Sequence, residues 1–242
     1  MLKELIATCD RILTPPNCHA CGTILYESIN AFDANLCLDC AQEIPVMPAN
    51  ACPLCGSPVR SVLDFKRGRC PACRSASWGF DGLTACFAYN GTARSLIHQL
   101  KYQGRPYLAG TMARLMYTVI HKESVAVFDG LVPVPLFPAR LRERAFNQAW
   151  VLAEHLSRDT DVPVLSLLER VKNTRSQALL CEKDRRTNVE GAFRVFPGQD
   201  LSGQRLLLVD DILTTGATAG AAAAALKEAG AEHVAVLAFA KG

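Results

Sequence analysis

The chain carries little net charge and has no long apolar run. A formal net charge of +3 over 242 residues is too small to indicate a nucleic-acid partner by itself. No uninterrupted apolar segment approaches the roughly 20 residues that a membrane-spanning helix needs. The first residues, MLKELIATCDRILTPP, include Glu4 and Asp10 and lack the apolar core of an export signal. We therefore expect a cytoplasmic protein without a membrane span.

The sequence also lacks the common nucleotide-binding loops. It contains neither a GxxxxGK[ST] nor a GxGxxG motif, which excludes the ordinary mononucleotide and dinucleotide loops. Low hydrophobicity with high charge would indicate disorder, but 50% of the residues are hydrophobic and 20% are charged. The length suits one large domain or two smaller ones.

Cysteine, in contrast, is abundant. Eight of the 11 cysteines form four CxxC pairs, in the order C-x2-C-x15-C-x2-C and then C-x2-C-x14-C-x2-C. A zinc-ribbon pattern that occurs twice predicts two structural Zn²⁺ sites of four thiolates each. The candidate ligands are Cys18, Cys21, Cys37, Cys40, Cys52, Cys55, Cys70 and Cys73. Pairing in sequence order needs shorter loops than a cross-braced arrangement, so we favour it.

Other interpretations of the cysteines are weaker. An iron–sulfur cluster is the rival metal site, and a redox site would need one pair rather than four. His19 lies inside the first pair, where we expect a neighbour rather than a ligand. Cys9 and Cys86 are expected to be small core residues. Structural zinc leaves no open coordination position, so it accounts for folding and not for function.

Residues 1–77 are interpreted as an N-terminal helix followed by the double zinc ribbon. Apolar residues recur at helical spacing over residues 2–13, and two prolines end the pattern. Within the ribbon, RSVLDFKRGRCPACR combines basic residues with an aromatic one, which suits phosphates and a stacked base. A solvated hairpin tip explains the same residues equally well. The nucleic-acid candidates are Arg60, Phe65, Lys66, Arg67, Arg69 and Arg74.

Residues 78–242 alternate between apolar strands and helical patterns, which predicts a parallel sheet with helices on both faces. The expected strands cover residues 83–88, 128–134, 205–209 and 233–240. The expected helices cover residues 92–102, 107–121, 139–158 and 218–229.

The stretch LLLVDDILTTGATAG places two carboxylates between a buried strand and the start of a helix. Asp210 and Asp211 should stand at the carboxyl end of the strand, where open α/β sheets bind ligands. The free N–H groups at the helix start suit an anion, aided by the hydroxyls and glycine of Thr214, Thr215, Gly216, Ala217 and Thr218. A ribose 5-phosphate would satisfy both halves, with Mg²⁺ offsetting the acids. A simple Mg²⁺ site or a capped helix end is the alternative.

VDDILTTGAT resembles the phosphoribosyl-pyrophosphate (PRPP) motif of type I phosphoribosyltransferases, and the whole chain resembles the ComF family, which joins zinc cysteines to such a domain. Further matching stretches are LKYQGR (100–105), VPVPL (132–136), RLRERAFNQA (140–149) and the spaced Arg170, Thr174, Gln177, Arg185, Asn188 and Phe193. In the family the third stretch usually reads RGFNQ, so Ala145 replaces a glycine.

The resemblance implies a type I phosphoribosyltransferase-like α/β fold preceded by the double zinc ribbon, and it implies roles for the residues. Asp210 and Asp211 would hold the ribose and act in catalysis, residues 214–218 would bind the 5-phosphate, and Val134 and Pro135 would bind pyrophosphate. Arg170, Thr174, Gln177, Arg185 and Asn188 would belong to a flap over the site.

Two functions are compatible with these residues. As an enzyme, the protein would transfer the ribosyl group of PRPP to a nitrogen acceptor that no stretch identifies. As a ComF-type protein, it would bind single-stranded DNA and work with the DNA-uptake machinery in natural transformation, or in the use of DNA as a nutrient, with PRPP as a bound ligand.

Overall fold

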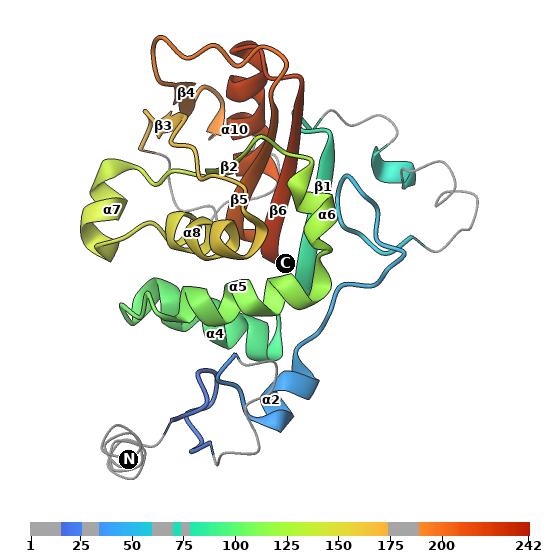
Figure 1. The fold of residues 1–242 in the computed structure, drawn as a ribbon, viewed down its shortest axis with the longest axis vertical. Coiled ribbons are helices and arrows are strands. Elements are labelled where there is room, and N and C mark those ends of the chain that lie inside the picture. The colour runs from blue at the N-terminus through green and yellow to red at the C-terminus, as the bar shows by residue number, and fades with distance from the viewer. Residues whose placement is uncertain (1–15, 26–33, 60–69, 74–77, 174–188) are drawn as a thin grey trace.

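The computed structural model describes residues 16–25, 34–59, 70–73, 78–173 and 189–242 (Figure 1). The helix expected over residues 2–13 lies outside this part of the chain. In the described residues no helix is both long enough and apolar enough to cross a bilayer.

A four-stranded parallel sheet forms the centre of the larger domain. Its strand order is β1-β6-β5-β2. The strands are β1 (Gly82–Ala88), β2 (Gly130–Pro133), β5 (Arg205–Leu213) and β6 (His233–Lys241). The two inner strands are apolar and buried from Leu206 to Val209 in β5 and from Val234 to Ala240 in β6, as expected of a parallel sheet that is covered on both sides. The predicted α/β class is confirmed.

Helices cover both faces of this sheet. On one face, α4 (Gly91–Tyr102), α5 (Leu108–Val119) and α8 (Gln148–Thr160) share a buried cluster with alternate residues of β5, including Leu207 and Val209. On the other face, α10 (Ala217–Glu228) packs against the intervening residues, Leu206 and Leu208. Successive side chains of a strand point to opposite faces of the sheet, so the side chains of β5 contribute to two separate hydrophobic clusters.

Three small elements of the sheet domain were not expected from the sequence. They are α6 (Lys122–Ala126) and the antiparallel pair β3 (Leu168–Arg170) and β4 (Phe193–Val195), which packs beside α10. Each has five residues or fewer, which is too short to show a hydrophobic period.

The single helix expected over residues 139–158 is wrong. The structure has two helices, α7 (Pro138–Arg144) and α8, separated by a turn. Ala145 ends α7 in the left-handed region, with φ of 65°, and the Asn147 side chain accepts a hydrogen bond from the Ala149 N–H at 3.1 Å to cap α8. The turn uses the position where the family pattern has glycine, which adopts such a φ without steric cost.

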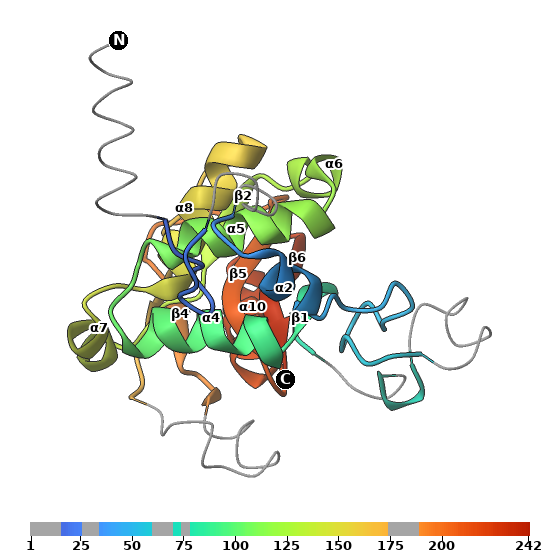
Figure 2. The same cartoon turned by 90° about the horizontal axis from the view of Figure 1, so that it is seen from below.

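The two zinc-ribbon units pack against different parts of the sheet domain (Figure 2). The first, built around Cys18 to Cys40 and including α2 (Leu38–Glu43), lies on α4, where Ser95 and Gln99 donate hydrogen bonds to the Ala20 carbonyl at 3.0 and 3.2 Å. The second, built around Cys52 to Cys73 and including the 3-10 turn η1 (Pro71–Cys73), lies at the start of β1, where Leu83 N donates to the Pro53 carbonyl at 2.6 Å.

Candidate functional site

The eight CxxC cysteines form two separate groups. Cys18, Cys21, Cys37 and Cys40 make the first, and the second consists of Cys52, Cys55, Cys70 and Cys73. Within each group all sulfur atoms lie within 4.8 Å of one another. The pairs therefore combine in sequence order, as favoured, and not in a cross-braced arrangement.

The two groups are built by the same local structure. In the first, Gly22 N donates to the Cys18 carbonyl at 2.8 Å, and in the second Gly56 N donates to the Cys52 carbonyl at the same distance. Both glycines have positive φ, 80° and 68°, so the predicted tight turn after each first pair is confirmed. This turn presents both thiols of a pair to one point.

The sulfur geometry fits a mononuclear tetrahedral site. Zn–S bonds of about 2.3 Å place neighbouring sulfurs about 3.8 Å apart. The Cys21–Cys37 sulfurs are 3.8 Å apart and the Cys55–Cys70 sulfurs 3.6 Å. Hydrogen bonding by Thr23 lowers the pKa of Cys21 to about 6, whereas burial and the neighbouring thiols raise the pKa of Cys40. Without a metal, four thiols in contact cannot all ionise, because the negative charges of the thiolates repel one another. A bound divalent cation offsets this repulsion. Both groups thus fit structural zinc.

Of the other cysteine and histidine predictions, those for His19 and Cys86 can be compared with the structure. His19 is not among the metal-ligating groups of the described residues; its Nδ1 lies 2.6 Å from the Thr111 hydroxyl of α5. Cys86 is fully buried in the core. Cys9 lies outside the described residues.

A cavity of about 300 Å³ opens at the carboxyl end of the sheet, beside the two aspartates. Asp210 and Asp211 lie within β5, not after it, because β5 pairs with β6 as far as Leu213. On its other side the pairing with β2 ends at Val209. The aspartates therefore belong to a stretch of β5 that is paired on one side only, and both line the cavity.

The aspartate pair is held by a lysine from α4. Lys101 Nζ lies 2.8 Å from Asp211 Oδ2, and their side chains are only 15% and 6% exposed. The Asp211 backbone N–H also donates to Asp210 Oδ1 at 2.9 Å. Burial, followed by the charge of Asp211, raises the pKa of Asp210 to about 7. Near neutral pH, Asp210 therefore holds a proton part of the time, which reduces its repulsion of Asp211 beside Lys101.

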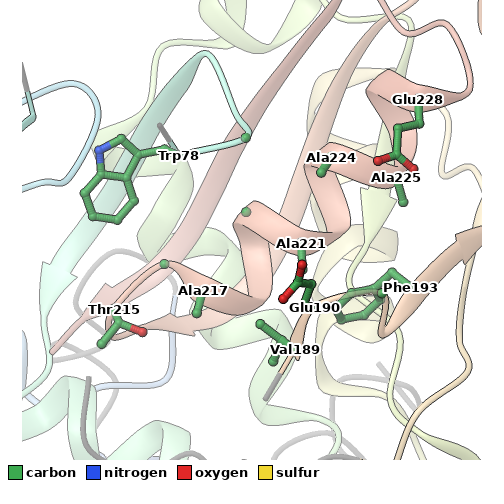
Figure 3. A pocket seen from close by; sticks show the side chains of 14 residues that line it. Trp78, Val189, Glu190, Phe193, Thr215, Ala217, Ala221, Ala224, Ala225 and Glu228 are labelled. Carbon is green, nitrogen blue, oxygen red and sulfur yellow. The ribbon is translucent and has the colours of Figure 1, made fainter. Parts of the chain in front are cut away.

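The predicted phosphate loop divides between two cavities. Thr214 and Thr218 line the cavity with the aspartates, whereas Thr215, Gly216 and Ala217 line a second cavity of about 490 Å³ beside α10 (Figure 3). Gly216 is the N-cap of α10, with φ of 74° and no side-chain cap. Gly216 is thus followed by a helix N-terminus, the kind of element that binds anions through its backbone N–H groups.

A polar and basic wall faces the aspartates. Val134 and Pro135 line the first cavity, and the Val134 carbonyl accepts a hydrogen bond from Asn147 Nδ2 at 3.1 Å. Arg140, Arg144, Gln148 and Arg170 line it as well. Burial, and then the charge of Arg140, lowers the pKa of Arg170, while Asp210 acts in the opposite direction. Acids and guanidinium groups therefore share one cavity.

Gln148 is the most buried polar side chain of this wall. It is 2% exposed, and its Oε1 accepts from Arg144 at 3.0 Å. Its Nε2 has no hydrogen-bond partner among the described residues. A buried amide donor without a partner costs stability, and a ligand acceptor in the cavity would satisfy it.

Several predicted residues lie outside the described part of the chain. These are the flap residues Thr174, Gln177, Arg185 and Asn188 and the nucleic-acid candidates Arg60, Phe65, Lys66, Arg67, Arg69 and Arg74. Their roles stay predictions.

The sequence reasoning gave no role to several residues of the cavity. Lys101 and Tyr102 lie in LKYQGR, and Arg140, Arg144, Asn147 and Gln148 lie in RLRERAFNQA. Both stretches were recognised as family-like, and their basic side chains were the available signal. What could not be read from the sequence is that α4 and the α7–α8 turn meet β5 around one cavity.

Comparisons with known proteins agree with this architecture. Residues 10–74 match a family model described as double zinc ribbon domain, and residues 148–242 match one described as phosphoribosyl transferase domain. Together these define a zinc-ribbon protein with a phosphoribosyltransferase-like domain.

Curated relatives identify the family. The chain is 31% identical to competence protein F of Haemophilus influenzae over 85% of this chain and 90% of that protein. It is 31% identical to DNA utilization protein YhgH of Escherichia coli K12 (76% and 81%) and 29% identical to competence protein ComFC of Bacillus subtilis (82% and 80%). The chain belongs to the ComF family.

Among solved structures, the chain is similar to a glutamine PRPP amidotransferase from B. subtilis complexed with ADP and GMP. The TM-score is 0.35 and the identity 22%, over 56% of this chain and 26% of that one.

Proposed function

We propose that the cavity beside Asp210 and Asp211 binds PRPP or another ribose 5-phosphate together with Mg²⁺. The observation that carries this proposal is the meeting of an acid pair, two threonines of the predicted phosphate loop (Thr214 and Thr218) and a basic wall at one cavity of about 300 Å³. This volume lies at the lower end of the range of small-ligand sites. The match to the phosphoribosyl transferase domain model supports the same conclusion.

Each part of the ligand has a complementary part of the site. The 5-phosphate would accept hydrogen bonds from the first N–H groups of α10 and from the hydroxyls of Thr214 and Thr218. The 2,3-diol would donate to Asp210 and Asp211. Mg²⁺, when bound, would offset the charge of the two acids and of the departing pyrophosphate. Lys101 would keep Asp211 oriented before the ligand arrives.

The opposite wall would receive the pyrophosphate. Val134 and Pro135 supply the loop, and Asn147 fixes it through the Val134 carbonyl. Arg140 and Arg144 belong to α7, which follows this loop in the chain, and both line the same cavity. Guanidinium groups bind phosphate oxygens in a bidentate manner, so they suit a charged leaving group. The residues from Arg170 to Asn188 would form the flap that excludes water.

We further propose a role in DNA uptake or in the handling of single-stranded DNA, in the cytoplasm. The support comes from the relatives, which carry the names competence protein and DNA utilization protein. The basic residues of the second ribbon, Lys66, Arg67 and Arg69 among them, are the proposed contacts to the strand. Free thiols that serve as metal ligands suit a reducing compartment.

An active Mg²⁺-dependent phosphoribosyltransferase is the alternative, and the acid pair favours it. PRPP develops positive charge at its anomeric carbon as pyrophosphate leaves, and Asp210 or Asp211 could stabilise that charge. The acceptor is unassigned. Pyrophosphate release that requires both Mg²⁺ and one particular nucleophile, and that Asp210→Asn with Asp211→Asn abolishes, would favour the enzyme over a PRPP-binding role.

The test of the proposed function is calorimetric titration of the full chain with PRPP and Mg²⁺, with and without single-stranded DNA. We expect one PRPP site, lost in Asp210→Asn/Asp211→Asn. DNA binding should weaken steeply with salt and should be lost when Lys66, Arg67 and Arg69 are changed to alanine. Lys122→Ala, at an exposed lysine of α6, is the matched control. If DNA changes the affinity for PRPP, then PRPP must change the affinity for DNA by the same factor.

Absence of PRPP binding would contradict the proposed PRPP site. PRPP binding without any DNA binding would contradict the proposed role in DNA handling but not the PRPP site.

A further inference from the structure

Trp78 connects the second cysteine group to the start of α10. Its indole packs against the buried residues of the second zinc ribbon and also against the cluster beneath α10. Figure 3 shows it beside the start of that helix, near Thr215 and Ala217. One side chain therefore contacts both the metal-ligating unit and the predicted phosphate loop.

The contact with the loop is close. A Cβ atom placed on Gly216 would lie 3.0 Å from Cζ3 and 3.1 Å from Cε3 of the Trp78 ring. The ring thus rests on the backbone of the residue that caps α10. Gly216 has a positive φ and no side chain of its own, so the indole is a contact from outside the loop on this backbone position.

The backbone around Trp78 is equally close to α10. A Cβ on Gly220 would lie 2.6 Å from the Trp78 carbonyl oxygen, and one on Gly79 would lie 2.5 Å from the Gly220 carbonyl oxygen. These approaches involve main-chain atoms, which cannot turn aside as a flexible side chain can. Residues 78–79 and the first turns of α10 are therefore packed backbone to backbone.

The same segment is tied to the second cysteine group. Cys73 precedes Trp78 by only five positions in the chain. The Trp78 side chain also packs against the buried cluster that contains Cys73. On its other flank the second ribbon is fixed to β1 by the hydrogen bond from Leu83 N to the Pro53 carbonyl, 2.6 Å long. A metal ion bound by this group would join the part of the ribbon near Trp78 to the part that is hydrogen-bonded to β1.

We infer that Trp78 is a positioning residue for the phosphate loop, and that metal bound at the second cysteine group sets the ribose 5-phosphate affinity through it. This inference rests on the proposed function of the loop. Metal would hold the buried residues of the second ribbon against which Trp78 packs, and the indole would hold Gly216 with the first N–H groups of α10 in the geometry that a phosphate needs. Zinc would then have a role in ligand binding besides folding.

The chain offers a matched control, because Trp78 and Trp150 are its two tryptophans. Trp150 lies on α8, where its Nε1 donates to Glu154 at 2.8 Å. It lines neither the cavity beside the aspartates nor the second cavity beside α10. We expect Trp78→Ala to weaken ribose 5-phosphate binding about tenfold and Trp150→Ala less than twofold. Equal affinity of Trp78→Ala and the parent chain would overturn the inference.

Fluorescence provides a second measurement that does not depend on the alanine variant folding. In Trp150→Phe, Trp78 is the sole tryptophan, and its emission should change on addition of ribose 5-phosphate. Cys73→Ser, made in the Trp150→Phe chain, should shift this emission and lower ribose 5-phosphate affinity about tenfold while the first site keeps its zinc. Unchanged emission with ligand, or unchanged affinity after loss of the second zinc, would contradict the coupling.

Failure of the parent chain to bind ribose 5-phosphate would instead contradict the proposed function, and the inference with it.

Discussion

Replacing Asp210 by asparagine should stabilise the fold while removing ligand binding. Burial and the neighbouring Asp211 raise the pKa of Asp210 from 3.8 to about 7. The native protein therefore keeps a proton on Asp210 in a pH range where the unfolded chain has lost it. Between the unfolded pKa of about 3.9 and the native value, stability falls as pH rises, and above pH 7 the loss is complete. Asparagine carries no charge and avoids this cost.

The magnitude follows from the shift. A difference of about 3 pKa units, at about 1.4 kcal/mol each, gives about 4 kcal/mol as the upper value. The asparagine oxygen can still accept the Asp211 N–H that now bonds Asp210 Oδ1 at 2.9 Å, so the hydrogen bond is retained. We expect a gain of about 2 to 4 kcal/mol at pH 8, which corresponds to a rise in Tm on the order of 10 °C.

Thermal unfolding of the parent chain and Asp210→Asn from pH 5.5 to pH 8, in buffer without Mg²⁺, measures this effect. The stability difference should grow by at most about 1.4 kcal/mol per pH unit up to pH 7 and stay level above it. Asp81→Asn is the control of opposite sign. Burial raises the pKa of Asp81, but hydrogen bonds from Lys227 and Val234 N lower it overall, so this change should destabilise the fold at every pH of the series, opposite in sign to Asp210→Asn.

An Asp210→Asn variant with the Tm of the parent chain at pH 8, or with a Tm difference independent of pH, would refute the reasoning.

Three further changes test other parts of the structure. Lys101→Met leaves the carboxylate of Asp211 buried without its cation, so it should destabilise the fold by about 3 kcal/mol in urea unfolding. Lys122→Met breaks an exposed pair and should have a much smaller effect. Equal effects of the two changes would show that the 2.8 Å pair of Lys101 and Asp211 is unimportant. Ala145→Gly should raise the free energy of unfolding by about 1 kcal/mol, because its φ of 65° strains an alanine; a loss would contradict the left-handed turn. Cys40→Ser should reduce bound zinc from two ions per chain to one by atomic absorption; retention of both would exclude the first cysteine group as a site.

The parts of the fold that depend on neighbouring residues were predictable. The strand, turn and helix around VDDILTTGAT follow from an apolar run, two acids and a glycine that are adjacent in the chain. The pairing of the cysteines also follows from spacing, because the shorter loops close most readily. The observed bounds of β1, α4 and α10 differ from the expected ones by one residue at each shifted end.

The parts that depend on tertiary packing were not predictable. Ala145 favours a helix by intrinsic propensity, yet it turns left-handed between α7 and α8, where Asn147 caps α8 and hydrogen-bonds the Val134 carbonyl. Lys101 and Asp211 are 110 positions apart, and only the packing of α4 at the end of β5 joins them. Sequence patterns describe each element and not which side chains meet across elements.

A crystal of the full chain soaked with ribose 5-phosphate and Mg²⁺ tests the central claim most directly. The account predicts density in the cavity lined by Asp210, Asp211 and Thr214, with the phosphate over the first turn of α10 and the sugar hydroxyls within hydrogen-bonding distance of the two carboxylates. A cavity that stays empty at saturating ligand, or a ligand bound elsewhere with its phosphate away from α10, would contradict it.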